Sequence, residues 1–499
     1  MKKFTLALYV GCALSLNSIV AFADALASSQ TANVQDQNAQ DQTEVEKLNS
    51  PVTQSVSTLG DALAAAYVNN ASLLQARQDL MAKHQNIAIA KAEYFPKIRS
   101  AISMSASKLI GSGSSKDTSS SYPSKTNTST RSGNVTLSQN LFAGGATMAS
   151  VLSADQSIRG LWSDLLSNEQ KTFLSVIKAY IDLINKLSKV DVYKTNHIAM
   201  KKNYETAFEK HSIGEEPLTQ VANAESKLAG AEADLRTAEA DVVGAKATLA
   251  ALVGVDAANI KKPEEPSQLP QSLEQAISFA VENNPDVIKA QFDHRAAEAD
   301  IDKVKGAFLP SIDLTAKTSR DEASSRSINA SKYSPNLESS RGSNYQTNQQ
   351  IQVEMSYELY AGGKYSAQKR QAHDTAVAKR IAIESVKSDL VGQVKSTFES
   401  YHAAKTNIEN YKKQVKAAEV ALEATRQEMQ VGTKVLLDVL NAQTDLVKAK
   451  VGLIDAEKNY YQTAYQMVSL LGGLHAKAMK LSVNYFDPQK HFENISVGF

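Results

Sequence analysis

The sequence predicts a mainly α-helical protein that also carries a few membrane-type β-strands and is built from two internal repeats. Three observations support this fold class: one block of sequence occurs twice, two stretches read as very long helices, and four segments alternate apolar and polar residues. A unit of this length that repeats without insertions indicates one structural motif used twice in the chain.

The repeat is clearest at two glycine pairs. Leu141–Gly145 reads Leu-Phe-Ala-Gly-Gly, and it returns 218 residues later as Leu-Tyr-Ala-Gly-Gly at Leu359–Gly363. Further upstream the matched residues lie 214 apart, and a loop can absorb the difference. We therefore place the first repeat at 58–254, a linker at 255–271 and the second repeat at 272–473.

The N-terminus predicts an export signal. Two lysines precede an apolar run, and a small-x-small sequence of the kind that signal peptidase cleaves ends at Ala23. Residues 1–23 are expected to be removed, and the single cysteine, Cys12, leaves with them. Attachment of a lipid to Cys12 is the less favoured alternative. Residues 24–57 are polar and show no periodicity, which predicts a disordered segment.

The composition argues against several classes of function. The formal net charge of +1 gives no general attraction to nucleic acid. Once Cys12 is removed, neither a zinc-thiolate site nor a thiol nucleophile is available, and the eight histidines are scattered. No glycine-rich phosphate loop is followed by a predicted helix. We therefore expect no enzyme activity, no metal and no cofactor.

A very long helical hairpin is predicted after each glycine pair. From Ala146 to about His211 there is no proline, a turn follows at Gly214, and a return helix runs to Leu252. Large and small apolar residues occupy the two seam positions of five heptads in this return helix, which is typical of closely packed coiled coils. The large residues are Val221, Leu228, Leu235, Val242 and Leu249, and most of the small ones are alanine.

Four strands are predicted where a proline ends a helix and the apolar period changes from 3.6 to 2. They lie at about 97–108, 133–142, 311–320 and 347–360, and we expect the polar segments that join them in pairs to be loops. Strands of about ten residues with one apolar side are typical of outer-membrane barrels. The alternative is a half-buried soluble hairpin, for which the flanking helices offer no obvious apolar partner.

Four strands cannot close a barrel, because about eight is the practical minimum and an open edge is not tolerated in lipid. The chain is therefore expected to oligomerise around a shared barrel, with its helical hairpins continuing that barrel as a helical tube. Two copies would supply eight strands and three would supply twelve, and the arithmetic does not choose between them.

The repeated unit resembles the outer membrane efflux protein family, in particular its TolC-like branch. The resemblance covers about residues 58–473 and is carried by the Asn-Asn-Pro sequence that ends at Pro285, the two Leu-aromatic-Ala-Gly-Gly turns, and Val431–Leu440. It implies a homotrimer with a twelve-stranded outer-membrane β-barrel that continues into a periplasmic barrel of twelve long α-helices.

The resemblance also implies a function, as the exit channel of a tripartite efflux pump or a type I secretion system in the cell outer membrane. The implied partners are outer-membrane lipid, a periplasmic adaptor (membrane fusion) protein and an inner-membrane pump of the RND, ABC or MFS type. The cargo would be drugs or proteins. A periplasmic coiled-coil adaptor or scaffold without a pore is the alternative, and the double unit with its four amphipathic strands counts against it.

The family's periplasmic entrance carries two aspartates one helical turn apart. Here Asp438 matches the first of them, and Asn441 stands at the second position. The resemblance therefore implies one ring of carboxylates at the mouth, with a weaker attraction for cations than two rings would give. Without the family context, Asp438 would be interpreted as a solvated helix residue.

The same entrance is held shut in the family by a basic residue paired with an acid and a tyrosine. Lys434 matches the basic position and Thr219 also matches, whereas Gln220 and Met429 replace the acid and the tyrosine. We hypothesise that Lys434 pairs instead with an acid of the other hairpin tip, namely Glu209, Glu215 or Glu216. The sequence is equally compatible with an ordinary exposed ion pair, which would contribute less than ~1 kcal/mol to stability and would not hold the entrance shut.

Gly214, Gly432 and Thr433 lie at the predicted hairpin tips, where the resemblance implies contact with the adaptor. Simple capping of a helix C-terminus also explains the two glycines. The tail at 474–499 ends in alternating apolar residues up to Phe499, as the last strand of many barrels does, although the family's C-terminus stays in the periplasm.

Overall fold

The computed structural model describes residues 56–115, 118–256, 258, 260–266, 269–331 and 334–489. The expected signal sequence with its cleavage after Ala23, nearly all of the expected disordered segment and the end of the tail lie outside these described residues. The described chain forms two compact units. The first holds residues 86–155 and 296–376, and the second holds 56–85, 156–295 and 377–489.

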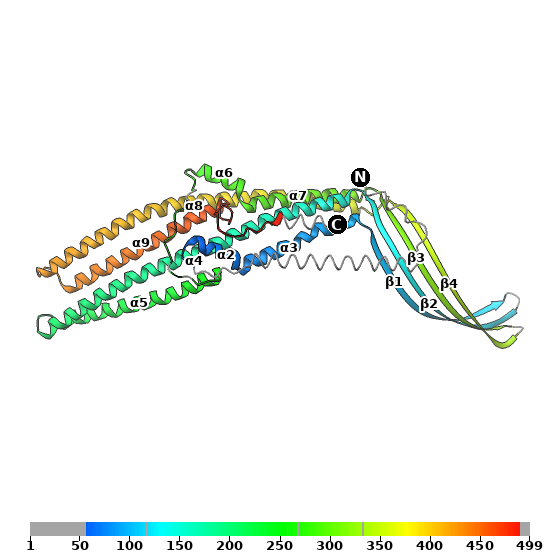
Figure 1. Cartoon of the computed structure of the whole chain (residues 1–499), viewed down its shortest axis with the longest axis horizontal. Coiled ribbons are helices and arrows are strands. Elements are labelled where there is room, and N and C mark those ends of the chain that lie inside the picture. Colours follow the sequence, from blue (N-terminus) through cyan, green and yellow to red (C-terminus); the bar gives the residue numbers. More distant parts are fainter. Residues whose placement is uncertain are drawn as a thin grey trace. The chain divides into compact units, whose positions relative to one another are not determined.

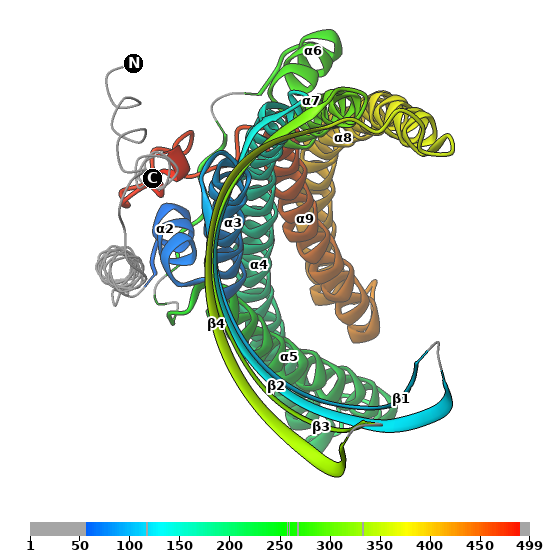
Figure 2. The ribbon, with the colours of Figure 1, turned by 90° about the vertical axis from the view of Figure 1, so that its right-hand side faces the viewer.

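The first unit contains a curved four-stranded sheet (Figure 2). Its strands are β1 (Lys97–Ser115), β2 (Thr118–Ala143), β3 (Ser311–Ser331) and β4 (Ser334–Ser356). All neighbours pair antiparallel in the order β1-β2-β3-β4. Each repeat therefore contributes one β-hairpin, and β1 and β4 are the two edges of the sheet.

β1 and β3 begin where the sequence predicts, whereas β2 and β4 begin earlier than predicted, at Thr118 and Ser334, and the expected polar loops were wrong. The segments Gly111–Arg131 and 319–347 belong almost entirely to the strands, which reach 19 to 26 residues in length. Hydroxyl groups connect neighbouring strands there, as in Thr126 of β2 with Ser327 of β3 at 3.2 Å. Because both faces of these outer halves are polar, the alternation that marks a half-buried strand is missing from the sequence.

The second unit is dominated by two long helical hairpins, and in each of them the two helices run side by side (Figure 1). The hairpins are α4 (Ala146–Ser212) with α5 (Leu218–Val253) and α8 (Lys364–Gln430) with α9 (Leu436–Leu470). These bounds confirm the predicted hairpins. The heptad register of α5 is confirmed too, since its buried residues include Val221, Ala224, Ala231, Ala238, Val242 and Leu249.

Shorter helices precede each hairpin: α2 (Leu59–Asn69), α3 (Ala71–Lys91) and η1 (Ala92–Tyr94) in the first repeat, and α6 (Leu273–Asn283) and α7 (Pro285–Gly306) in the second. The repeat is visible in single hydrogen bonds. Asn70 Nδ2 donates to the Leu252 carbonyl at 2.9 Å, and Asn284 Nδ2 donates to the Leu470 carbonyl at 3.1 Å. Each asparagine thereby fastens the start of a second short helix to the end of a hairpin.

The main core of the second unit lies between α2, α4, α5 and the segment that follows α9. Phe173, Tyr180 and Leu249 are fully buried in it, and Leu474 and Leu481 of the later segment close it. This segment thereby links the end of the second repeat to the start of the first.

Candidate functional site

One face of the sheet is apolar and exposed. The pairing register places Ile98, Leu137, Ala316 and Ile351 in one row across all four strands. On the same face Ile102 of β1 is 80% exposed and Val353 of β4 is 63% exposed, whereas Leu137 and Leu314 of the inner strands are half-buried. Exposed apolar side chains that gather on one face are typical of a surface that faces lipid or another protein.

The other face of the sheet is polar. Gln350 Nε2 donates to Gln352 Oε1 at 3.0 Å, and Gln352 Nε2 donates to Glu354 Oε2 at 3.1 Å along β4. Asn140 Nδ2 donates to Asp313 Oδ1 at 2.9 Å between β2 and β3. A sheet with one apolar and one hydrogen-bonding face has the two surfaces that a water-filled membrane barrel needs.

The hairpin tips are closed by glycine caps. Gly214 donates its N–H to the His211 carbonyl while Glu215 donates to Lys210, and Gly432 donates to Met429 while Thr433 donates to Glu428. Both glycines have φ of +82°, and no atom lies within 4 Å of where a Cβ would be. The capping interpretation is therefore confirmed, because backbone conformation, not lack of space, requires glycine here.

Asp438 lies in the first turn of α9. Its Oδ2 accepts a hydrogen bond from the Val435 backbone N–H at 3.3 Å, so the carboxylate caps the helix N-terminus. Its side chain is half-buried, whereas Asn441 on the next turn is exposed. The negative charge therefore has a structural role in addition to any role at an entrance.

The remaining expected entrance residues do not form one cluster. Met429 packs against two apolar clusters at the tip, which include Leu440 and Val439. Thr219 is exposed, and the buried Oε1 of Gln220 has no hydrogen-bond partner among the described residues.

Lys434 is exposed, and among the described residues of one chain it forms no ion pair with Glu209, Glu215 or Glu216. The pairing hypothesised from the sequence is therefore not present among the described residues of one chain.

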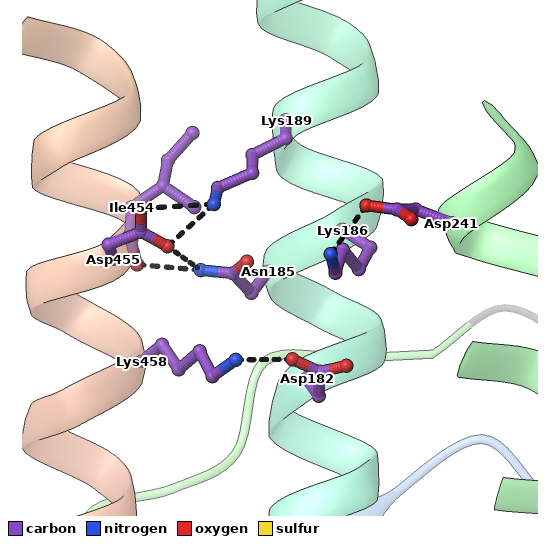
Figure 3. A network of polar contacts seen from close by, with 8 residues as sticks. All are labelled: Asp182, Asn185, Lys186, Lys189, Asp241, Ile454, Asp455 and Lys458. Atoms are coloured by element: carbon purple, nitrogen blue, oxygen red, sulfur yellow. Dashed lines mark hydrogen bonds and ion pairs between the residues drawn. The ribbon is translucent and has the colours of Figure 1, made fainter. Parts of the chain in front are cut away.

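A polar network joins α4 to α9 (Figure 3). Asn185 Nδ2 donates to Asp455 Oδ1 at 3.0 Å, and Lys189 pairs with the same carboxylate at 2.7 Å. Lys458 pairs with Asp182 nearby. The network fixes the first-repeat hairpin against the second-repeat hairpin of the same chain.

Lys186 links α4 to α5 on the other side of the same turn, through an ion pair with Asp241 at 2.5 Å (Figure 3). This hydrogen bond raises the pKa of Lys186 and lowers the pKa of Asp241. The α4–α9 partners could not be found from the sequence, because they join residues about 270 positions apart.

A buried carboxylate holds the segment after α9. Glu169 Oε1 accepts a hydrogen bond from the Ala476 backbone N–H at 2.5 Å, and Glu169 is 7% exposed. Arg77, 6% exposed, lies with its guanidinium carbon 4.0 Å from the centroid of the Tyr67 ring. Burial is the main influence on both charged groups: it raises the pKa of Glu169 and lowers the pKa of Arg77.

Within the part of the chain that the structure describes, no group of three or more His, Cys, Asp or Glu residues could hold a metal ion. No described helix combines the length and the apolar character that a membrane crossing requires.

The chain matches the model of the family "Outer membrane efflux protein" over residues 62–255 and 276–473, that is, over both repeats. The outer membrane efflux protein BepC of Brucella suis biovar 1 is 28% identical over 88% of this chain and 90% of its own length. The outer membrane protein TolC of Escherichia coli K12 is 25% identical over 70% and 71%. The crystal structure of the outer membrane protein VceC from Vibrio cholerae has 19% identity and a TM-score of 0.65, covering 83% of this chain and 96% of VceC.

The family match spans both hairpins and both pairs of strands, and the fold agrees with that of a solved outer-membrane protein. The chain therefore belongs to the outer membrane efflux protein family, as an outer-membrane exit channel with a large periplasmic part.

Proposed function

We propose that three copies of this chain form one channel, in which each copy gives four strands to a twelve-stranded barrel in the outer membrane. The observation that carries the proposal is the open sheet, which has two unpaired edges, an apolar face and a polar face. An unpaired edge in lipid leaves N–H and C=O groups without partners, so β1 of one copy must pair with β4 of the next. Side chains fill an eight-stranded barrel, so a duct favours three copies over two.

The helical hairpins continue this barrel as a twelve-helix tube in the periplasm. The proposed task is to pass drugs or proteins outwards from an inner-membrane pump of the RND, ABC or MFS type. A periplasmic adaptor links the two, and it docks on the tips around Gly214, Gly432 and Thr433. Passage through a duct involves no bond chemistry, so we propose no enzymatic role.

Two measurements on the purified detergent-solubilised protein test this function. We expect a complex that migrates as a trimer unless it is heated, and single-channel currents when it is added to planar bilayers. A pore-less adaptor or scaffold would give no currents at any concentration. A channel that forms but stays monomeric would contradict the shared barrel.

The periplasmic entrance is proposed to be held by contacts between copies. Lys434 is exposed and unpaired within one described chain, and Glu209, Glu215 and Glu216 lie at the other tip. Lys434→Ala should raise the open probability in bilayers, whereas Lys246→Ala, which removes an exposed lysine from α5, should leave it unchanged. Equal open probabilities for Lys434→Ala and the unmodified channel would remove Lys434 from the gate.

A further inference from the structure

On every strand the first charged residue of the apolar face is a cation. We count outward from the row of Ile98, Leu137, Ala316 and Ile351, away from the strand ends that join the helices. Residues of the same face follow at every second position, because side chains alternate across a strand. The first charged residues reached in this way are Lys108 on β1, Arg131 on β2, Arg320 on β3 and Arg341 on β4.

All four of these cations are exposed, and none is in an ion pair among the described residues. Over the described side chains, this face carries two further cations, Lys125 and Arg326, against a single acid, Glu322. The opposite face is balanced: Lys97, Arg99 and Lys317 stand with Asp313, Asp321 and Glu354. The excess of positive charge is therefore specific to the face that bears the apolar residues.

An aromatic side chain lies among these cations. Tyr345 is 74% exposed and lies in the row of Arg131 and Glu322. The Arg320 guanidinium carbon lies 5.9 Å from the centroid of the Tyr345 ring. Aromatic residues gather where the lipid tails meet the headgroups, so Arg131 lies at that level. Arg320 lies one same-face row nearer the apolar residues, and Lys108, Arg326 and Arg341 lie two such rows beyond it.

Two arginines of this face oppose each other directly. Arg326 on β3 pairs in register with Arg341 on β4. Like charges directly across a strand pair are destabilising, and an anion shared between them removes the repulsion. Phosphate fits this role best, because guanidinium groups bind its oxygens through paired hydrogen bonds.

We propose that this cationic row, defined as Lys108, Arg131, Arg320, Arg326 and Arg341, binds the phosphate-bearing headgroups of outer-leaflet glycolipid. The inference rests on the proposed barrel, because that barrel turns the apolar face towards lipid. The occupant follows from charge complementarity and from continuity with the apolar surface. Three copies would surround the channel with a closed ring of such sites.

The test compares two variants that remove the same charge from opposite faces of β1 to β4. The outer-face variant carries Arg131→Gln, Arg320→Gln and Arg341→Gln. The control variant carries Lys97→Gln, Arg99→Gln and Lys317→Gln. Both full-length proteins are placed in phosphatidylcholine nanodiscs with bisphosphorylated lipid A, with its dephosphorylated form, or with phosphatidylglycerol, and bound lipid is measured by native mass spectrometry at several salt concentrations.

Each basic residue at a charged membrane surface contributes about a fivefold gain in binding, so the outer-face variant should bind bisphosphorylated lipid A on the order of 100-fold more weakly. The control variant and the unmodified protein should bind it equally, and both should lose it at high salt. Replacing the same three arginines by lysine should retain the salt-dependent binding, which covers the case of a glutamine variant that folds poorly.

Equal lipid A binding by the outer-face and control variants would overturn the proposal. Equal binding of bisphosphorylated and dephosphorylated lipid A by the unmodified protein would overturn it too. If the unmodified protein retains phosphatidylglycerol as strongly as bisphosphorylated lipid A, the cationic row is a surface for anions in general. This outcome would also overturn glycolipid as the partner. Single-channel currents in pure phosphatidylcholine bilayers keep the two claims apart. A channel that conducts there but has no preference for lipid A fails this inference alone.

Discussion

Glu169 offers a sharp test of how the second unit is held together. The carboxylate is buried, accepts a hydrogen bond from Ala476 and lies near the buried Arg77. Glu169→Ala leaves a buried N–H without an acceptor and removes the negative charge that offsets Arg77. Breaking one side of a buried charged arrangement costs about 3–5 kcal/mol of the free energy of unfolding. Glu169→Gln keeps an acceptor oxygen for the Ala476 N–H and no longer buries a charge, so it should cost less than Glu169→Ala.

The pH dependence of the same residue has a definite sign. Burial raises the pKa of Glu169 above its ordinary value, and this outweighs the lowering caused by the Ala476 N–H and by Arg77. The folded protein therefore binds this proton more tightly than the unfolded chain does. The stability that comes from this proton is fully present below the unfolded pKa, and it is lost as pH rises through the folded pKa.

Thermal unfolding of the detergent-solubilised protein, followed by circular dichroism between pH 7.5 and 4.5, measures both effects. The unmodified protein should gain stability relative to Glu169→Gln as the pH falls. At neutral pH the Gln variant should be more stable than the Ala variant. An Ala variant as stable as the unmodified protein, or a difference that shrinks on acidification, would refute the reasoning.

Two further predictions concern the hairpins. Gly432→Ala should lower the free energy of unfolding by about 1–2 kcal/mol, because Gly432 has φ of +82°, where a side chain has room but the backbone conformation is unfavourable. Gly230→Ala inside α5, where there is also free space, should instead raise the free energy of unfolding by about 1 kcal/mol. Chemical denaturation that gives both changes the same sign would contradict this. Asp438→Asn should lower the cation selectivity of the channel and Asn441→Asp should raise it, as read from reversal potentials in a salt gradient; unchanged potentials in both would place these residues away from the entrance.

The sequence was sufficient where a residue's role depends on its near neighbours. The glycine pairs, the heptads of α5 and the Asn-Pro step between α6 and α7 are local signals, and the predicted helices agree with the structure to within a few residues. The prolines before β1 and β3 placed the starts of those strands correctly for the same reason.

The sequence was insufficient where position is set by distant partners. The outer halves of the strands contain serine, threonine and asparagine on both faces, so no apolar period identifies them. Their pairing is determined by register carried over from the apolar halves. The cations of the cationic row could have been found by extending the period of two past Met104 and Val135. No sequence pattern predicts the pairs Asn185–Asp455 and Glu169–Ala476, because only tertiary packing brings these residues together.

Disulfide trapping between β1 and β4 tests the shared barrel most directly. In a Cys12→Ser background, Ile102→Cys on β1 is combined in turn with cysteine at position 345, 347, 349 or 351 of β4. The two edges of one sheet are separated by three strand spacings, about 14 Å, so no disulfide can form within a copy. Oxidation should yield a covalent trimer for at least one pair, whereas a series that ends at covalent dimers, or forms no crosslink in membranes that hold the folded protein, would contradict the account.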